Sequence, residues 1–165
     1  MWHVRDAAPS DAEELAEVHV AAWRAAHRRV LPDAVLDRLD ISAGARHWEA
    51  VLGDPPPGSR VLVLEVGAGD GQVLAGVAVL GSRSPEVGVL EEIAVDPARW
   101  GGGGGRLLLR AATDALAQAG HAEAVLSVLP DNARALSLYE SEGWTADGDE
   151  VDADGRATYR RSLTG

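Results

Sequence analysis

The chain has 165 residues and a formal net charge of −11, and 46% of its residues are hydrophobic. It contains no cysteine, which excludes disulfide bonds, a thiol nucleophile and thiolate metal ligands. All fifteen basic residues are arginine, so lysine Schiff-base chemistry and a phosphate-loop lysine are excluded too, and the acidic balance argues against nucleic-acid binding, which needs a basic face.

No segment predicts export or insertion into a membrane. The first residues, MWHVRDAAPSDAEE, lack the basic stretch and apolar core of a signal peptide, and no apolar run approaches the length of a membrane span. We therefore expect a cytoplasmic protein. The length suits one domain, residues 1–165, with a sizeable core.

The N-terminal third is predicted to be mainly helical. A short strand over 2–6 precedes a helix over 9–30, in which apolar residues recur at helical spacing. Two shorter helices are expected over 31–40 and 42–53. The proline-rich loop DPPPGS then ends this part of the chain, because consecutive prolines cannot join a helix.

The rest of the chain alternates between β-rich and helical segments. Residues 60–66 and 72–80 form β-rich runs joined by GAGDG, which is typical of a hairpin, and residues 87–95 form a third strand. The elements expected after these are a helix over 106–120, a strand over 122–129, a helix over 131–143 and a closing pair of strands over 144–150 and 156–163. This order predicts one mixed α/β layer domain.

Five consecutive glycines, Gly101–Gly105, separate the third strand from the helix over 106–120. Glycine loses the most backbone freedom on folding, so such a run is either a flexible spacer or a place where backbone lies against another group. A strand–glycine–helix junction exposes free N–H groups at the helix start, which favour phosphate. Two phosphate motifs fail: Arg106-Leu107 replaces the Lys-Ser/Thr of a phosphate loop, and a G-x-G-x-x-G pattern would need glycine at one of these positions.

Two segments carry a family resemblance. The first runs from Val95-Asp96-Pro97 through Trp100 into the glycine run, and the second is DNARALSLYESEGW. This pair resembles the GCN5-related N-acetyltransferases. In that family V-x-P is followed by Gln or Arg and by x-x-G-x-G/A entering a helix, and a later helix opens with Asn and carries a Tyr before Gly and an aromatic residue.

The match extends to the order of elements over nearly the whole chain. Gly103 and Gly105 fall on the two small positions of the first motif. The N-terminal part is similar to bacterial members related to ribosomal-protein N-terminal acetyltransferases. The resemblance implies the α/β acyl-CoA N-acyltransferase fold, a mixed, mostly antiparallel sheet flanked by helices. Its acceptor-side helices would span 10–53 and its acetyl-CoA-binding core 60–145.

The resemblance also implies which residues hold acetyl-CoA as co-substrate. Backbone groups of the third strand would pair with the pantetheine arm, the glycine loop would bind the pyrophosphate, and the Asn would contact pantetheine. These residues are Ile93, Val95, Trp100, Gly101, Gly102, Gly103, Gly104, Gly105, Arg106 and Asn132. Trp100 departs from the usual Gln or Arg, and glycine at 102 and 104 replaces a basic and an aliphatic residue, so we expect a mobile loop that orders on binding.

Three residues are candidates for acid–base chemistry. By resemblance Tyr139 is the general acid beside the thiolate, on the helix face of Asn132. The glutamate of some relatives matches Val89 here, so Glu91, expected on the same strand face, is the first candidate base. Glu92, expected on the opposite face, is the second. Deprotonation through ordered water, with no single base, is a third possibility.

The acceptor side is expected on the first helix. His19, Trp23 and His27 recur every four residues, and the family walls its acceptor pocket here, so Trp23 and His27 are candidate substrate contacts, with ordinary packing as the alternative. His47 and Trp48 could face the same cleft. No metal motif is present.

The function expected from this resemblance is direct acetyl transfer from acetyl-CoA to a primary amine on a small molecule or peptide. A catalytically inactive CoA-binding module is the alternative, and a homodimer is left open. Neither nucleic acid nor membrane is expected as a partner.

Overall fold

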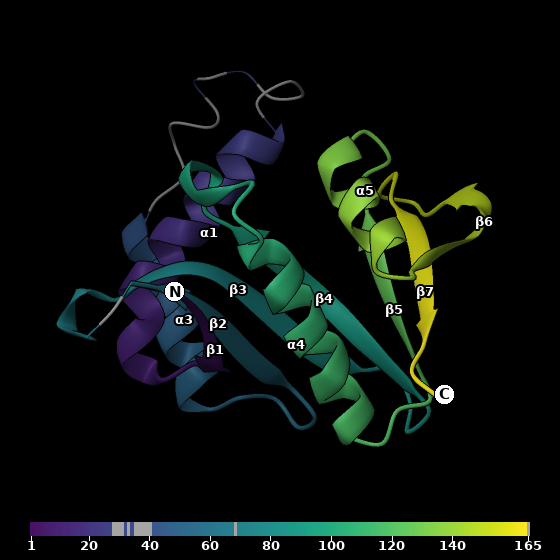
Figure 1. The fold of residues 1–165 in the computed structure, drawn as a ribbon, viewed down its shortest axis with the longest axis horizontal. Helices are drawn as coiled ribbons and strands as arrows, with labels where there is room; N and C mark the ends of the chain where they lie inside the picture. Colours follow the sequence, from purple (N-terminus) through teal and green to yellow (C-terminus); the bar gives the residue numbers. More distant parts are fainter. Residues whose placement is uncertain (28–31, 33, 35–40, 68, 165) are drawn as a thin grey trace.

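Seven strands form one sheet in the computed structural model, in the order β1-β2-β3-β4-β5-β7-β6 (Figure 1). The structure describes residues 1–27, 32, 34, 41–67 and 69–164. The strands are β1 (Trp2–Asp6), β2 (Arg60–Val66), β3 (Val73–Ser82), β4 (Val87–Val95), β5 (Glu123–Val128), β6 (Thr145–Val151) and β7 (Ala157–Ser162). All neighbouring pairs are antiparallel except β4 and β5, which run parallel. The mixed, mostly antiparallel sheet expected from the sequence is therefore confirmed.

Helices pack on both faces of this sheet. They are α1 (Ala12–His27), α3 (Ile41–Gly53), α4 (Gly104–Gln118) and α5 (Ala133–Ser141), with 3-10 turns at Pro9–Asp11, Gly69–Gly71 and Pro97–Arg99. The helix predicted over 31–40 falls almost wholly outside the described residues. Within the described ranges, no helix combines the length and the apolarity needed to cross a bilayer.

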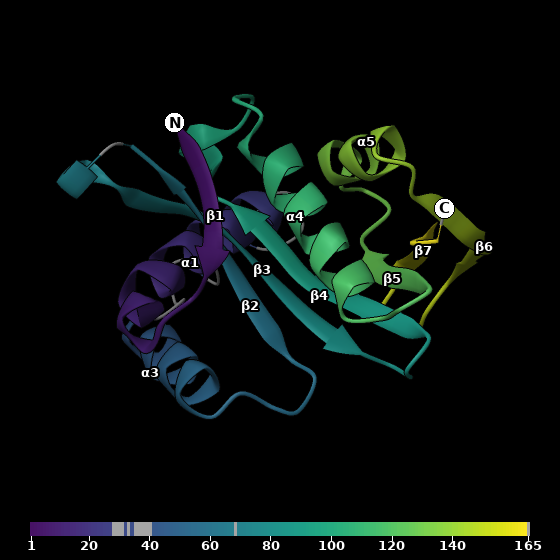
Figure 2. The same ribbon diagram turned by 60° about the horizontal axis from the view of Figure 1, so that its bottom comes forward.

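The two faces of the sheet carry two cores, which explains the apolar run of β2. Val61 and Val63 pack with α1 and α3, whereas Leu62 and Leu64 pack with α4. Figure 2 shows α1 and α3 on one face of the sheet and α4 on the other. All four are buried, because both faces are covered, and each contributes roughly 1.5–3 kcal/mol through burial. Truncating Leu64 to alanine would cost about 2–5 kcal/mol. The same two-sided packing fixes which side chains of β4 face α1 and which face α4.

Candidate active site

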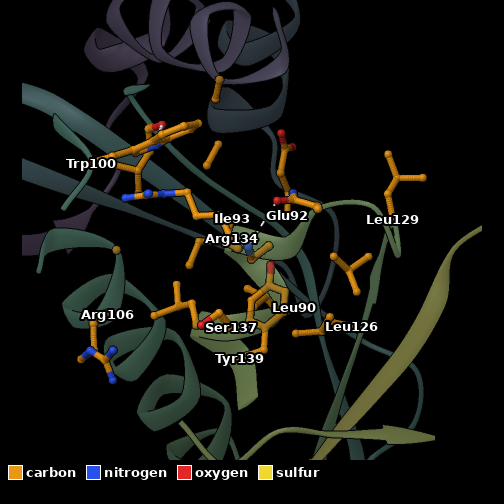
Figure 3. Close-up of a pocket in the computed structure, with 18 of the residues that line it drawn as sticks. Leu90, Glu92, Ile93, Trp100, Arg106, Leu126, Leu129, Arg134, Ser137 and Tyr139 are labelled. Carbon is orange, nitrogen blue, oxygen red and sulfur yellow. Dashed lines mark hydrogen bonds between the residues drawn. The ribbon is translucent and has the colours of Figure 1, made fainter. Parts of the chain in front are cut away.

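A cavity opens where β4 and β5 part. The two strands are paired only from Val87↔Glu123 to Leu90↔Leu126, and beyond this point they diverge. The cavity between them has a volume of about 820 Å³, and its walls come from α1, the second half of β4, the glycine loop, the end of β5 and α5 (Figure 3). The parting leaves two strand edges without a neighbouring strand, so their backbone groups are available to an extended ligand.

Ile93 and Val95 present their backbone to this cavity. The N–H of Asp96 donates to Ala75 of β3 at 2.7 Å, so by strand alternation the backbone groups of Ile93 and Val95 point away from β3. The Val95 carbonyl already accepts a hydrogen bond of 3.0 Å from the Trp100 indole. The strand edge expected from the sequence is therefore open, although the Trp100 side chain already donates a hydrogen bond to its last carbonyl, that of Val95.

Four of the five consecutive glycines stand where a larger residue would strain the backbone or clash with a neighbour. Gly101 and Gly103 have φ of 86° and 87°, which other residues rarely adopt. At Gly102 and Gly104 a Cβ would lie 3.0 and 2.9 Å from the Trp2 ring, whose indole donates to the Gly102 carbonyl at 3.0 Å. Only at Gly105 would a Cβ make ordinary contacts. The run is therefore a shaped turn braced by β1.

The turn delivers the N-terminus of α4 to the cavity. Gly103 caps the helix, and Gly101, Gly103 and Gly105 line the cavity, whereas Gly102 and Gly104 are turned toward Trp2. The first N–H groups of a helix have no partner within it, and the helix dipole makes them electropositive. The chemistry of this end of the cavity therefore favours an anion.

Three arginines before and after the glycine run are compensated by carboxylates. Arg99 pairs with Asp96 at 2.9 Å, while Arg106 and Arg110 share Glu142 at 2.5 and 2.9 Å. The pair of arginines, Arg110 first, holds the pKa of the Glu142 carboxyl below its usual range. Arg106 lines the cavity, but its guanidinium is held by hydrogen bonds to Ser141 and Glu142 at the C-terminal end of α5.

Arg134 is the cation that the sequence analysis missed. Its guanidinium lies 4.5 Å from the centroid of the Trp100 ring, and it has no carboxylate partner among the described residues (Figure 3). A cation over an indole gains about 0.5–2 kcal/mol. Two features of the sequence could have indicated this cation. Trp100 replaces a polar residue and can stack with a cation, and Arg134 stands in the first turn of the helix that lines the cavity.

Helix α5 presents the two predicted residues from one face. Asn132 caps the helix, its Oδ1 accepting the Ala135 N–H at 3.2 Å, and both Asn132 and Tyr139 line the cavity. The Tyr139 ring is buried against Trp144, and its hydroxyl points into the cavity without a hydrogen-bond partner among the described residues (Figure 3). Burial raises the pKa of Tyr139 to about 12, so its O–H stays protonated at neutral pH.

A β-bulge in β4 changes the geometry of the two glutamates. Leu80 pairs with Leu90 and Val79 pairs with Glu92, which leaves Glu91 as an extra residue without a partner on β3. A bulge bends the strand and increases its twist, which suits the point where β4 leaves β5.

The prediction that Glu91 and Glu92 point to opposite faces is wrong for this reason. Ile93 packs in the core on the α4 side, while Glu92 reaches α1. A Cβ on Gly81, which faces α1, would lie 2.5 Å from a Glu91 carboxylate oxygen, so Glu91 also lies on the α1 side. Simple alternation would also put Glu91 on the face of Ile93 and Val95, but the bulge separates them, and these two residues lie on the α4 side. Both carboxylates line the cavity on its α1 side.

Helix α1 forms the remaining wall. His19 and Trp23 line the cavity, and His19 Nε2 lies 2.5 Å from Glu92 Oε1. The hydrogen bond to Glu92 raises the pKa of His19, and partial burial opposes that change. His27 ends α1, but its side chain lies outside the described residues.

The expectation for the third helical segment is wrong. Trp48 is buried in the core between α1, α3 and the sheet, and His47 is exposed; neither is among the cavity-lining residues that the structure describes. Trp48 instead supports the cavity wall indirectly, because its ring packs edge-on against His19 at 6.0 Å. No cluster of three or more potential metal ligands occurs within the described part of the chain.

The model of the acetyltransferase (GNAT) family matches residues 12–144, most of the chain. The chain belongs to this family. A curated GNAT relative, mycothiol acetyltransferase of Kocuria rhizophila, is 44% identical over 61 residues. That match covers 37% of this chain and only 20% of the relative, so it spans about a fifth of the relative's length.

Solved GNAT structures share the fold over the full length. The coenzyme A complex of PaiA N-acetyltransferase from Thermoplasma acidophilum has a TM-score of 0.78 at 16% identity, covering 98% of this chain and 99% of that one. The acetyl-CoA complex of yncA from Salmonella typhimurium has a TM-score of 0.71 at 23% identity, covering 100% and 95%. The ribosomal-protein-S18-alanine N-acetyltransferase of Escherichia coli has a TM-score of 0.69 at 21% identity, covering 100% and 96%.

Proposed function

We propose that the cavity binds acetyl-CoA and that the protein transfers the acetyl group directly to a primary amine on a small molecule or peptide. One observation carries this proposal. The β4 and β5 edges part beside a helix N-terminus, and the cavity there is lined by Tyr139, whose hydroxyl has no hydrogen-bond partner in the described part of the chain. Such a cleft fits a ligand with an extended amide-bearing arm, a phosphate group at one end and a reactive carbonyl at the other.

Different residues of the cavity suit different parts of acetyl-CoA. The free edge of Ile93 and Val95 suits the amides of pantetheine, and Asn132 lines the same cavity. The N–H groups at the start of α4 suit the pyrophosphate, with Arg134 as the nearby cation. The solved relatives that hold coenzyme A or acetyl-CoA support the same ligand here.

Direct transfer needs few groups. The amine nitrogen attacks the thioester carbonyl, a C–N bond forms, and the C–S bond breaks with its electron pair moving to sulfur. The Tyr139 O–H, kept protonated by its raised pKa, donates a hydrogen bond to the departing sulfur. The burial that raises the pKa of this phenol also disfavours a free thiolate, so protonation of the sulfur is favoured there. The names of relatives that describe N-acetyl transfer support an amine as acceptor.

Calorimetric titration with acetyl-CoA tests the binding half of the proposal. Gly103→Glu places a carboxylate at the start of α4, where the pyrophosphate is expected. Gly120→Glu is the matched control, because Gly120 also has a positive φ (99°) and open space around it, at the opposite end of the same helix. We expect saturable binding by the wild type and the control and its loss in Gly103→Glu. Equal binding by both variants would overturn the placement of the ligand.

A further inference from the structure

The His19–Glu92 pair joins α1 to β4 in the wall of the cavity. The bulge at Glu91 brings Glu92 to the α1 side, where its carboxylate lies 2.5 Å from His19 Nε2. Both side chains remain about one third exposed, at 36% and 35%, and both line the cavity. The pair is therefore accessible to a small molecule, and the fold that creates the cleft also creates the pair.

The geometry leaves one imidazole nitrogen available. Glu92 engages Nε2, and within the described part of the chain no residue hydrogen-bonds to Nδ1. The Trp48 ring packs edge-on against the imidazole ring and restricts its rotation. An imidazole with a carboxylate on one nitrogen and the other nitrogen free is arranged to accept a proton, since the carboxylate stabilises the imidazolium that forms.

We propose that His19 is the proton acceptor for the incoming amine and that Glu92 is its positioning residue; this rests on the proposed acetyl transfer. The acceptor enters as an ammonium ion and loses one proton to Nδ1 of neutral His19. The freed electron pair on nitrogen forms the C–N bond, and the C–S pair leaves with sulfur. As the amide forms, the nitrogen loses a second proton and the departing sulfur gains one, with the Tyr139 hydroxyl hydrogen-bonded to that sulfur. His19 then releases its proton to solvent, so acetyl-CoA and an ammonium ion give an acetamide, free CoA and one proton.

The surroundings of His19 set the sign of its pH dependence. Glu92 contacts it and Glu91 lies next in β4, while α3 contributes His47, whose ring also contacts Trp48, and the 3-10 turn contributes the paired Arg99 and Asp96. Glu92 is the dominant influence and raises the pKa of His19. The neutral, proton-accepting form is thus reached only above the ordinary histidine value of about 6.5.

The test measures kcat/KM for two probe amines by thiol release from acetyl-CoA. Ethylamine, like a lysine side chain, is almost wholly protonated at neutral pH and needs a base, whereas hydroxylamine is largely unprotonated and does not. For the wild type with ethylamine, log kcat/KM rises with pH and levels off above the pKa of His19. Glu92→Gln moves that inflection to lower pH, because it removes the group that raises the pKa.

His19→Gln is the central variant, because glutamine can still donate a hydrogen bond to Glu92. We expect it to lower kcat/KM for ethylamine by about 10²-fold or more and to change hydroxylamine turnover only a few-fold. Its ethylamine profile should rise without levelling until the amine itself titrates. His47 also contacts Trp48 but is not among the cavity-lining residues that the structure describes, so His47→Gln should behave as wild type.

Other outcomes would overturn the proposal. Equal losses with both amines, or a levelling profile retained in His19→Gln, would make His19 a structural contact only. If log kcat/KM for ethylamine still levels off with rising pH in His19→Gln but no longer does so in Glu92→Gln, Glu92 is the base. Acetyl-CoA binding without turnover of either amine by the wild type would instead refute the proposed function itself, and the base assignment with it.

Discussion

Gly104 tests whether the glycine run is shaped by packing. An alanine Cβ there would lie 2.9 Å from both Leu64 and Trp2, whereas ordinary contacts begin near 3.4 Å. Leu64 is fully buried and the Trp2 indole is hydrogen-bonded to Gly102, so neither can yield freely. Overpacking of this kind costs about 1–3 kcal/mol, and the gain in helix propensity returns up to about 1 kcal/mol. We expect a net loss of about 1–2 kcal/mol.

Gly105→Ala is the matched control in the next residue. Its Cβ would lie 3.6 Å from Val95 and 3.8 Å from Leu138, so only the propensity gain remains. Thermal unfolding should show Tm lowered by roughly 2–8 °C in Gly104→Ala and unchanged or slightly raised in Gly105→Ala. In a Trp2→Ala background the Gly104→Ala penalty should become smaller, because the contact with Trp2 is removed and only the contact with Leu64 remains. Equal Tm for the two glycine variants, or an unchanged penalty without Trp2, would refute this reasoning.

Three further predictions concern the cavity and the N-terminal strand. Tyr139→Phe should lower kcat by about 10²–10⁴-fold with little change in the Kd of acetyl-CoA, as measured by steady-state kinetics and calorimetry. Because the pKa of Tyr139 is raised, the wild-type enzyme should keep the acid role of this residue up to about pH 11. Arg134→Gln should weaken acetyl-CoA binding about tenfold and reduce its salt dependence, whereas Arg110→Gln should do neither; calorimetry at two ionic strengths decides. Arg5 lowers the pKa of Asp11, so the ion pair stabilises the fold above about pH 4, and this stabilisation is lost as the pH falls further. Arg5→Gln should therefore reduce the free energy of unfolding more at pH 7 than at pH 3, as measured by denaturant titration.

Local signals in the sequence were enough for the elements that hold the site. Periodicity and breakers predicted the order of strands and helices described here, and the glycine run between a strand and a helix indicated an anion site. Asn132 and Tyr139 were placed on one helix face by their spacing, as the structure has them. These features depend on neighbours within a few residues, which is why sequence alone could give them.

The features that sequence reasoning missed depend on distant partners. The bulge at Glu91 exists because Leu80 and Val79 pair around it and Gly81 leaves room for its carboxylate, and simple alternation cannot show that. The neutralisation of Arg106 needs Glu142, 36 residues away.

The first measurement to make is thiol release from acetyl-CoA by the wild-type protein against a panel of primary amines, with acetylated product identified by mass spectrometry. The absence of cysteine removes any protein background. The account predicts amine-dependent release with one acetylated amine for each thiol, reduced in Tyr139→Phe. Saturable acetyl-CoA binding without amine-dependent release, or release unaffected by loss of the Tyr139 hydroxyl, would contradict the central claim that this cleft catalyses acetyl transfer.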